Sequence, residues 1–216
     1  MKEEDLVYFN PFANTEKSAN RLPHWNQPSA TYFITYRLSD AVPASLRRQW
    51  LEERKIWLNH HPKPWDAKTE REYHLRFSAR IDAWLDAGHG ECLLRDFARR
   101  RLVQEVITKF DGERYVHHAW VLMPNHVHIL ATVHVDISLK ELIGPWKGTS
   151  TWAINRLMQR SGKLWQDDYF DRLVRDGDHF ASCVRYIRRN PEKAKLREGE
   201  YTLYESDLAK LFAERR

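Results

Sequence analysis

Two extended runs in the middle of the chain place the strongest constraint on its fold. Residues 114–122 and 126–133 are rich in β-branched and apolar side chains, and only Met123, Pro124 and Asn125 separate them. So short a connection joins antiparallel neighbours, because parallel strands need a crossover of about a dozen residues or more. The sequence therefore predicts an antiparallel pair of strands joined by a tight turn.

Further elements are expected on both sides of this pair. β-Branched and aromatic residues followed by turn-forming residues predict strands over 30–38 and around 169–174. Apolar residues at helical spacing predict helices over 43–59, 67–87, 96–111, 136–159 and 180–189. A surface helix is expected in the tail, 201–216.

Single residues predict where some of these helices begin, bend and end. Asp136 is expected to open the helix over 136–159, and Pro145 to kink it near Glu141, because proline removes a backbone donor and clashes one turn back. Pro191 is expected to end the helix over 180–189 and to start a second segment, because the residue before a proline avoids helical geometry.

The order strand, helices, strand, strand, helix, strand, helix predicts an α+β fold. It matches a ferredoxin-like split βαβ sandwich with an antiparallel sheet. The expected additions are a helical insertion after the first strand, over about residues 41–111, and a C-terminal helical extension over about 197–216. No internal repeat or Gly/Ser-rich linker divides the chain, so residues 1–216 are expected to form one domain.

Composition excludes several classes of protein. No window approaches the roughly 18 uncharged apolar residues of a membrane span, and the opening MKEEDLVYFNPF lacks a secretory h-region. A cytoplasmic protein without membrane partners is therefore expected. Cys92 and Cys183 are too few for a disulfide framework or a four-thiolate zinc site. A net charge of +5 suits a phosphate-containing partner, although many proteins that bind no nucleic acid share it.

Two histidines stand two residues apart on the second extended run. Side chains on a strand alternate between faces, so His126 and His128 project from one face while Val127 and Ile129 enter the other. Paired imidazoles are suited to a divalent cation, with further ligands from elsewhere in the fold. Taken alone, such a pair is more often two surface histidines on a half-exposed strand.

The helix over 180–189 carries a second group of candidates. Tyr186 lies at the flank of its apolar stripe, and Asn190 follows four residues later, so both side chains point the same way. They offer a nucleophile and a carbonyl ligand, and this end also has a phosphate-attracting group of arginines, Arg185, Arg188 and Arg189. On the helix pattern alone, a half-buried tyrosine and a solvated arginine face are the more frequent interpretation.

Three ordered motifs resemble one known family. They read HAWVLMPNHVHIL at 118–130, LWQDDYFDRLVRD at 164–176 and RYIRRNPEKAKL at 185–196. Together they resemble the REP-associated tyrosine transposases, which are single-tyrosine members of the HUH nuclease superfamily. The resemblance extends from about Arg21 to Leu196. A single His-x-His is a weak signal, whereas three ordered motifs with the right intervening architecture are a strong one.

This resemblance implies a role for each candidate. His126 and His128 would be a metal pair, Asn190 the third ligand, and Tyr186 the nucleophile. The implied cofactor is Mg²⁺ or Mn²⁺. The implied activity is metal-dependent cleavage and transfer of single-stranded DNA strands at palindromic hairpins, through a 5′-phosphotyrosine intermediate. No ATP is needed, because one phosphodiester is exchanged for another.

Other residues receive weaker assignments. Glu113, Asp168 and Asp171 are acids near the motifs, but the sequence does not identify a general base among them. The candidates for DNA contact are Trp146, Lys147, Arg172, Arg175, Arg185, Arg188 and Arg189, with Trp152, Arg156 and Trp165 beside them. Trp146 and Trp152 have near-helical spacing and suit the core equally well.

The implied partner is single-stranded or hairpin DNA of the REP type, met at the nucleoid, and a monomer is favoured over a dimer. The alternative is a protein derived from a transposase that binds hairpin DNA or RNA on the same sheet without catalysis. Retention of both histidines, Tyr186 and Asn190 favours the enzyme.

Overall fold

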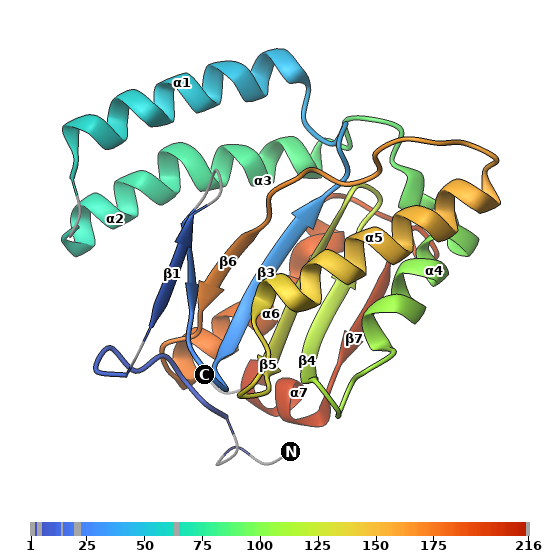
Figure 1. The fold of residues 1–216 in the computed structure, drawn as a ribbon. Helices are drawn as coiled ribbons and strands as arrows, with labels where there is room; N and C mark the ends of the chain where they lie inside the picture. The colour runs from blue at the N-terminus through green and yellow to red at the C-terminus, as the bar shows by residue number, and fades with distance from the viewer. Residues whose placement is uncertain (1–2, 4–5, 14, 20–22, 63–64, 215–216) are drawn as a thin grey trace.

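A five-stranded antiparallel sheet forms the centre of the protein. The structure is a computed structural model that describes residues 3, 6–13, 15–19, 23–62 and 65–214. The strand order is β6-β3-β5-β4-β7 (Figure 1). The strands are β3 (Thr31–Arg37), β4 (Tyr115–Leu122), β5 (His126–Val133), β6 (Phe170–Leu173) and β7 (Thr202–Glu205).

The predicted tight hairpin is confirmed at β4 and β5. Val121 stands opposite His128, and Leu122 opposite Val127. The turn is closed by Met123, whose N–H donates to the carbonyl of His126 at 2.9 Å. β5 therefore lies inside the sheet, between β4 and β3, with its backbone paired on both sides.

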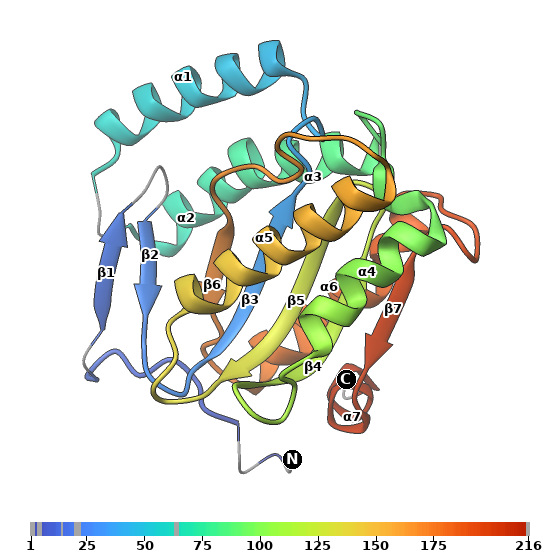
Figure 2. The same ribbon diagram turned by 45° about the vertical axis from the view of Figure 1, so that its right-hand side comes forward.

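Helices cover both faces of the sheet (Figures 1 and 2). On one face lie α4 (Phe97–Thr108) and α5 (Leu139–Leu157), and on the other α6 (Gly177–Lys193) and α7 (Asp207–Glu214). Each face has its own buried core. Val127 and Ile129 enter the core under α4 and α5, whereas Leu130 enters the core under α6.

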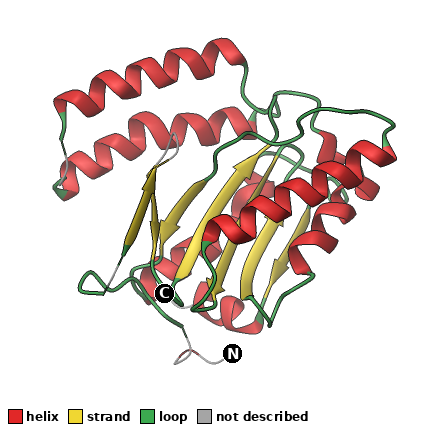
Figure 3. Ribbon diagram, viewed as in Figure 1, coloured by secondary structure: helices red, strands yellow, loops and turns green. Residues whose placement is uncertain are grey.

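The predicted helical insertion has a small core of its own and also adds Leu85, Leu93 and Leu94 to the core under α4 and α5. It contains α1 (Ala44–His60), α2 (Ala67–Tyr73), a π-helical turn (His74–Ser78), α3 (Ala79–Asp86) and a 3₁₀ turn (Leu93–Arg95). A separate aromatic core, formed by Trp50, Trp57 and Phe77, joins α1 to the helices that follow. Figure 3 shows these helices beside the sheet rather than stacked on a face, near an additional hairpin of β1 (Glu16–Ala19) and β2 (Pro23–Asn26).

The predicted fold class is confirmed. The succession β3-α4-β4-β5-α5-β6 and the neighbour order β6-β3-β5-β4 make a ferredoxin-like split βαβ sandwich. The insertion follows its first strand, as expected. No helix in the described part of the chain is both long and apolar enough to cross a membrane. The assignment of 1–216 to one domain stays a prediction.

The C-terminal tail corrects one expectation. Residues 201–216 were predicted to be helical, but β7 adds a fifth strand beside β4 before α7 begins. The free edge of β4 explains the difference, because an unpaired row of backbone groups favours another strand. Four residues are too few to show the alternation of apolar and polar side chains by which a strand is recognised in a sequence.

Three helix boundaries also differ from the predictions. Ser138, rather than Asp136, caps α5, because it forms a capping box with Glu141. α4 ends at Thr108, short of the predicted 111. α6 continues through Pro191 to Lys193, where proline sacrifices only one bond close to the helix end. α5 is continuous across Pro145, and the kink near Glu141 stays a prediction.

A buried arginine ties the tail to the rest of the fold. Arg100 is 1 % exposed and donates to the carbonyls of Leu94, Arg95 and Gly199 and to Thr202 Oγ1, at 2.7–2.9 Å. These bonds join α4 to the segment that leads into β7.

We expect Arg100→Met to lower the free energy of unfolding by about 3 kcal/mol, because it leaves buried acceptors without donors. At this chain length the loss corresponds to roughly 6–12 °C in Tm, measurable by thermal denaturation. Arg101→Met is the control, because Arg101 is exposed on the same helix and pairs only with Glu105. Equal Tm values for the two variants would contradict the structural role.

Candidate active site

The two histidines of β5 lie under α6, on the face opposite α4 and α5. Both are 1 % exposed, and their ring centroids are 4.7 Å apart in an edge arrangement. The alternation predicted from the sequence is confirmed, because Val127 and Ile129 lie in the core of the other face. The histidines are thus not surface residues on a half-exposed strand.

The turn before β5 sets the tautomer of His126. Asn125 donates through Nδ2 to the carbonyls of Leu85 and His89, at 3.2 and 3.3 Å. Its Oδ1 therefore faces His126 Nδ1, 2.8 Å away, and accepts that N–H. The network assigns the proton to Nδ1 and leaves a lone pair on Nε2.

His128 is held in a similar way from the neighbouring strand. Its Nδ1 lies 2.7 Å from Thr35 Oγ1 on β3, and its Nε2 is buried without a hydrogen-bond partner. Burial lowers the pKa of His126 to about 3 and the pKa of His128 well below its ordinary value. Both rings are therefore neutral at pH 7, which is the form that binds a metal ion.

α6 brings Tyr186 and Asn190 to the same place. Asp176 caps this helix through a 2.7 Å bond from the N–H of His179, and the apolar stripe of α6 packs on the sheet. Tyr186 is half-buried, with its ring centroid 5.1 Å from His128 and 5.6 Å from Phe33.

Asn190 occupies the next turn of α6 and is 2 % exposed. Asn190 raises the pKa of His126 and lowers that of Tyr186, in both cases against the larger effect of burial, and its Oδ1 is buried without a hydrogen-bond partner. The four residues proposed from the sequence thus converge from one strand and one helix of the same chain.

The donor set fits a divalent cation. The orphaned Nε2 of His128 and Oδ1 of Asn190 are buried polar atoms, which ordinarily find partners. The amide oxygen suits Mg²⁺ and Mn²⁺, which prefer oxygen ligands, whereas the two neutral imidazoles are ligands that Zn²⁺ and iron also accept. Among the described residues, no group of three or more His, Cys, Asp or Glu side chains is placed to hold a metal ion, so Asn190 is needed for a third ligand.

The phenol of Tyr186 is held in its protonated form. Burial and the neighbouring carboxylates of Asp82 and Asp86 raise its pKa above the ordinary value. Asp82, on α3, has a larger effect on this pKa than Asp86. An attack by this oxygen therefore requires another group to take its proton.

Basic residues lie near the two histidines, Tyr186 and Asn190. Lys193 and Arg37 act electrostatically on His126, and Lys193 and Arg172 act on Asp82. Arg172 projects from β6 on the same face as Phe33, its cross-strand neighbour, and donates to His74 of the insertion. Positive potential at this point would attract a phosphate group.

Some of the residues predicted to contact DNA lie on the other side of the sheet from Tyr186. Trp146 is 4 % exposed in the core under α5, so its assignment as a DNA contact is wrong. Lys147, on the same helix, donates to the Asp167 carbonyl at 2.8 Å on the face opposite Tyr186. Neither residue lies at the site, because the sheet stands between α5 and α6.

The remaining arginines lie on or near α6. Arg188 forms two bonds with Glu205 of β7, at 2.8 and 3.0 Å. Arg185 is half-buried, and Arg175 and Arg189 are exposed. Trp152 is 62 % exposed but belongs to α5, on the other face.

The three acids near the motifs do not reach the phenol. Glu113 is exposed and precedes the start of β4, which pairs with the far end of β5. Asp168 and Asp171 both bind the imidazole of His24, with Asp168 Oδ1 3.0 Å from Nε2. Asp82, which the sequence did not single out, is the carboxylate at Tyr186.

Sequence reasoning missed Asp82, Thr35 and Asn125 as members of the site. Asn125 lies inside the motif that carries the histidines, so its position was a usable signal. Asp82 and Asp86 flank the apolar stripe of α3 one turn apart, but nothing local shows that this helix approaches α6.

Part of the chain is similar to known proteins. Residues 95–190 match a family described as "Transposase IS200 like", and this segment contains both histidines, Tyr186 and Asn190. No curated protein matches the chain. A solved structure described as a REP-associated tyrosine transposase bound to a REP hairpin is similar over 81 % of this chain and 74 % of that chain, with 17 % identity and a TM-score of 0.49. The predicted resemblance to transposases is confirmed for residues 95–190.

His24 gives a testable pH dependence of stability. Burial alone would lower its pKa, but hydrogen bonds and charges of Asp168 and Asp171 raise it to about 9 from an ordinary value of 6.5. Because the folded-state pKa lies above the unfolded one, the stabilisation is complete below pH 6.5 and is lost as the pH rises through 9.

We expect the Tm difference between the wild type and His24→Gln to be largest near pH 6 and to shrink steadily towards pH 9.5, since the proton is then lost in both states. Thermal denaturation across this range measures it. A difference that stays constant with pH would contradict the ion pairing.

Proposed function

We propose, on the premise that residues 95–190 are an IS200-like transposase segment, that this protein cleaves and joins single-stranded DNA. The reaction would be a metal-dependent strand transfer at palindromic hairpins, with Tyr186 as the nucleophile and a 5′-phosphotyrosine intermediate. The observation that carries the proposal is the convergence of His126, His128, Asn190 and Tyr186 at one point between the sheet and α6.

The binding residues are suited to one cation and one phosphate. His126 would contribute Nε2, because Asn125 holds the proton on its Nδ1. His128 and Asn190 would contribute the two orphaned atoms, Nε2 and Oδ1. A divalent ion held there would neutralise charge on a nonbridging phosphate oxygen.

The residues around the phenol would orient the attack. Phe33 and His128, which stack on each other, both make edge contacts with the ring of Tyr186 and would restrict its rotation. Asn190 acts on the pKa of both Tyr186 and His126, so the same amide would link the nucleophile to the ligand set. Lys193 and Arg172 would draw the DNA backbone to this point.

Hairpin DNA is proposed as the substrate because the three motifs resemble those of the REP-associated tyrosine transposases. A single strand also fits the reaction, because the scissile phosphate must reach a site enclosed between a sheet and a helix. Tyr186 lies beside the histidines of its own chain, so no partner subunit is required to complete the site. This supports action as a monomer, on DNA in the cytoplasm.

We expect Tyr186→Phe to abolish covalent attachment to hairpin DNA, because the variant lacks the attacking oxygen, while DNA affinity stays within a few-fold. The measurement is a denaturing gel of labelled single-stranded hairpin oligonucleotide incubated with protein and Mn²⁺. Tyr204→Phe is the control, since Tyr204 lies on β7 and stacks on Trp120 outside the site. A wild-type protein that binds the hairpin but never forms an adduct would favour the non-catalytic binding protein instead.

We expect His126→Ala to weaken Mn²⁺ binding by at least about 100-fold, because loss of a direct ligand costs no less than loss of its outer-shell partner. Calorimetric titration of the DNA-free protein measures this independently of activity. His134→Ala, just beyond the end of β5, should bind Mn²⁺ as the wild type does. Equal affinities for all three proteins, or full cleavage in the presence of a chelator, would exclude the metal role.

A further inference from the structure

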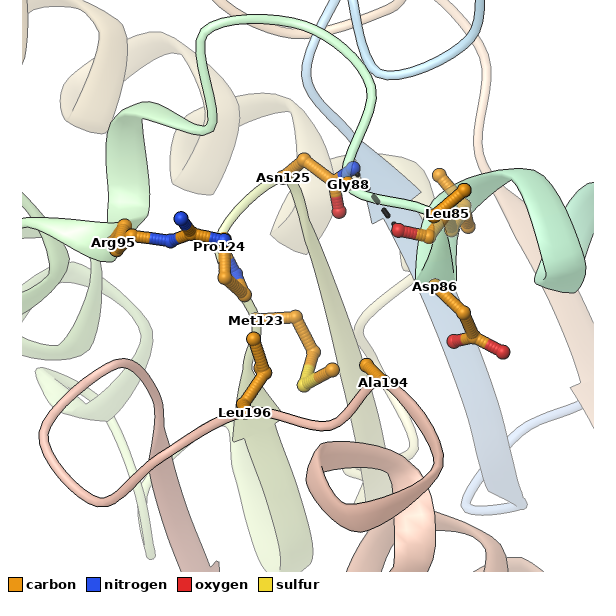
Figure 4. Close-up of a pocket in the computed structure, with 10 residues that line it drawn as sticks. Leu85, Asp86, Gly88, Arg95, Met123, Pro124, Asn125, Ala194 and Leu196 are labelled. Carbon is orange, nitrogen blue, oxygen red and sulfur yellow. Dashed lines mark hydrogen bonds between the residues drawn. The ribbon is translucent and has the colours of Figure 1, made fainter.

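A pocket lies beside the proposed active site, where the helical insertion meets the sheet and the end of α6. Its volume is about 150 Å³. Its walls come from the end of α3, the 3₁₀ turn, the turn between β4 and β5, and the segment that follows α6 (Figure 4). The lining residues are 85–88, Arg95, 123–125, Ala194 and Leu196. Segments that are distant in the sequence thus build one cavity.

Direct bonds join this pocket to the proposed metal ligands. Asn125, in its wall, accepts the N–H of His126 through Oδ1 at 2.8 Å. The N–H of Ala194, in another wall, donates to the carbonyl of Asn190 at 3.0 Å. Ala194 lies one turn beyond Asn190, or about 5.4 Å along the helix axis. A DNA strand with a phosphate at the ligand set would therefore bring a neighbouring base to the pocket.

The volume of the pocket matches a single planar ring. An engineered cavity of about 150 Å³ in another protein binds one benzene molecule. A pyrimidine base has one six-membered ring and is similar in size. A purine has two fused rings, so its entry would require the lining residues to move apart.

The lining suits the faces of a base. Met123, Pro124 and Leu196 supply apolar side chains, and apolar side chains are the usual packing surfaces for a base that has left its stack. Both groups of the Asn125 amide are already engaged, because Nδ2 donates to the carbonyls of Leu85 and His89 while Oδ1 accepts from His126. The pocket therefore selects its occupant by shape more than by hydrogen bonds to this amide.

Basic side chains lie around the pocket. Those of Arg95 and Lys193 are each 53 % exposed; Arg95 approaches Glu200 at 3.4 Å, and Lys193 pairs with Asp86 at 2.8 Å. Figure 4 shows Arg95 and Asp86 on opposite sides of the cavity. Lys195 is exposed in the loop between Ala194 and Leu196. Such cations attract the phosphates on either side of a bound base.

We propose that this pocket binds one unpaired pyrimidine base of the DNA strand, turned out of its stack beside the phosphate that is cleaved. The inference rests on the proposed strand transfer and adds a determinant of sequence specificity to it. The energetic cost is small, because an unpaired base in a single strand has little stacking to lose. The insertion thereby takes part in recognition, since α3 and the 3₁₀ turn form two of the walls.

The test measures the affinity of the wild type for a labelled hairpin oligonucleotide with unpaired flanking nucleotides, in the presence of a chelator so that no metal-dependent cleavage occurs. Abasic sites replace the unpaired nucleotides one at a time. We expect one pyrimidine position at which loss of the base weakens binding by about 10–100-fold, the effect of burying one ring-sized apolar group. A purine at this position should weaken binding similarly.

Variants of Leu196 connect this position to the pocket. Leu196→Trp fills the cavity, so it should bind the intact DNA about 10–100-fold more weakly, with no further loss at the abasic site. Leu196→Ala enlarges the cavity and should accept the purine. Ala194→Met is a second filling variant, and Tm measurements confirm that each protein folds. Leu157→Trp is the control, because Leu157 is 54 % exposed on α5, across the sheet.

The outcomes separate the pocket from the reaction. Adduct formation by the wild type with Mn²⁺ tests the strand transfer, whereas base dependence without metal tests the pocket. If an adduct forms but no flanking base matters, or if the abasic site costs the wild type and Leu196→Trp equally, the pocket is not the base site. If the base dependence follows Leu196 but no adduct forms, the strand transfer fails and the base site stands. A wild type that binds no hairpin would overturn both.

Discussion

The two-sided burial of β5 is the constraint on which the candidate site depends. Its pleat sends Val127 and Ile129 into the core under α4 and α5 and sends His126 and His128 towards α6. A shift of one residue in the strand register would exchange the two faces and bury the imidazoles among apolar side chains. The apolar packing of Val127 and Ile129 on one face of β5 therefore also fixes the direction of His126 and His128 on the other face.

The helical insertion is coupled to the site by polar contacts, although Leu85, Leu93 and Leu94 also belong to the core under α4 and α5. Its aromatic cluster is separate from both cores of the sheet, yet Asn125 binds the carbonyl of Leu85 while it orients His126. Asp86 pairs with Lys193 at the other side of the same junction. The orientation of His126, a proposed ligand, and the position of Lys193, on the helix of the nucleophile, therefore both depend on contacts with the insertion.

Local patterns predicted much of the fold and the four central residues. The hairpin of β4 and β5, the alternation of His126 and His128, and the shared face of Tyr186 and Asn190 all follow from geometry within one element. The predictions failed where the outcome depended on another element. Trp146 has the same helical spacing whether it faces the sheet or solvent, and β7 formed because β4 had a free edge.

The sequence by itself determined which side chains share a face of each element, because strand and helix periods are properties of the local backbone. It determined the ligand pair, the nucleophile and the amide in this way, and the order of elements that makes a split βαβ sandwich. Only the tertiary structure decided that α6 covers the histidines, that Asn125 sets the tautomer of His126, and that a carboxylate of α3 raises the pKa of Tyr186. These depend on contacts between residues about 40 to 100 positions apart, which arise from how helices pack and which no local period encodes.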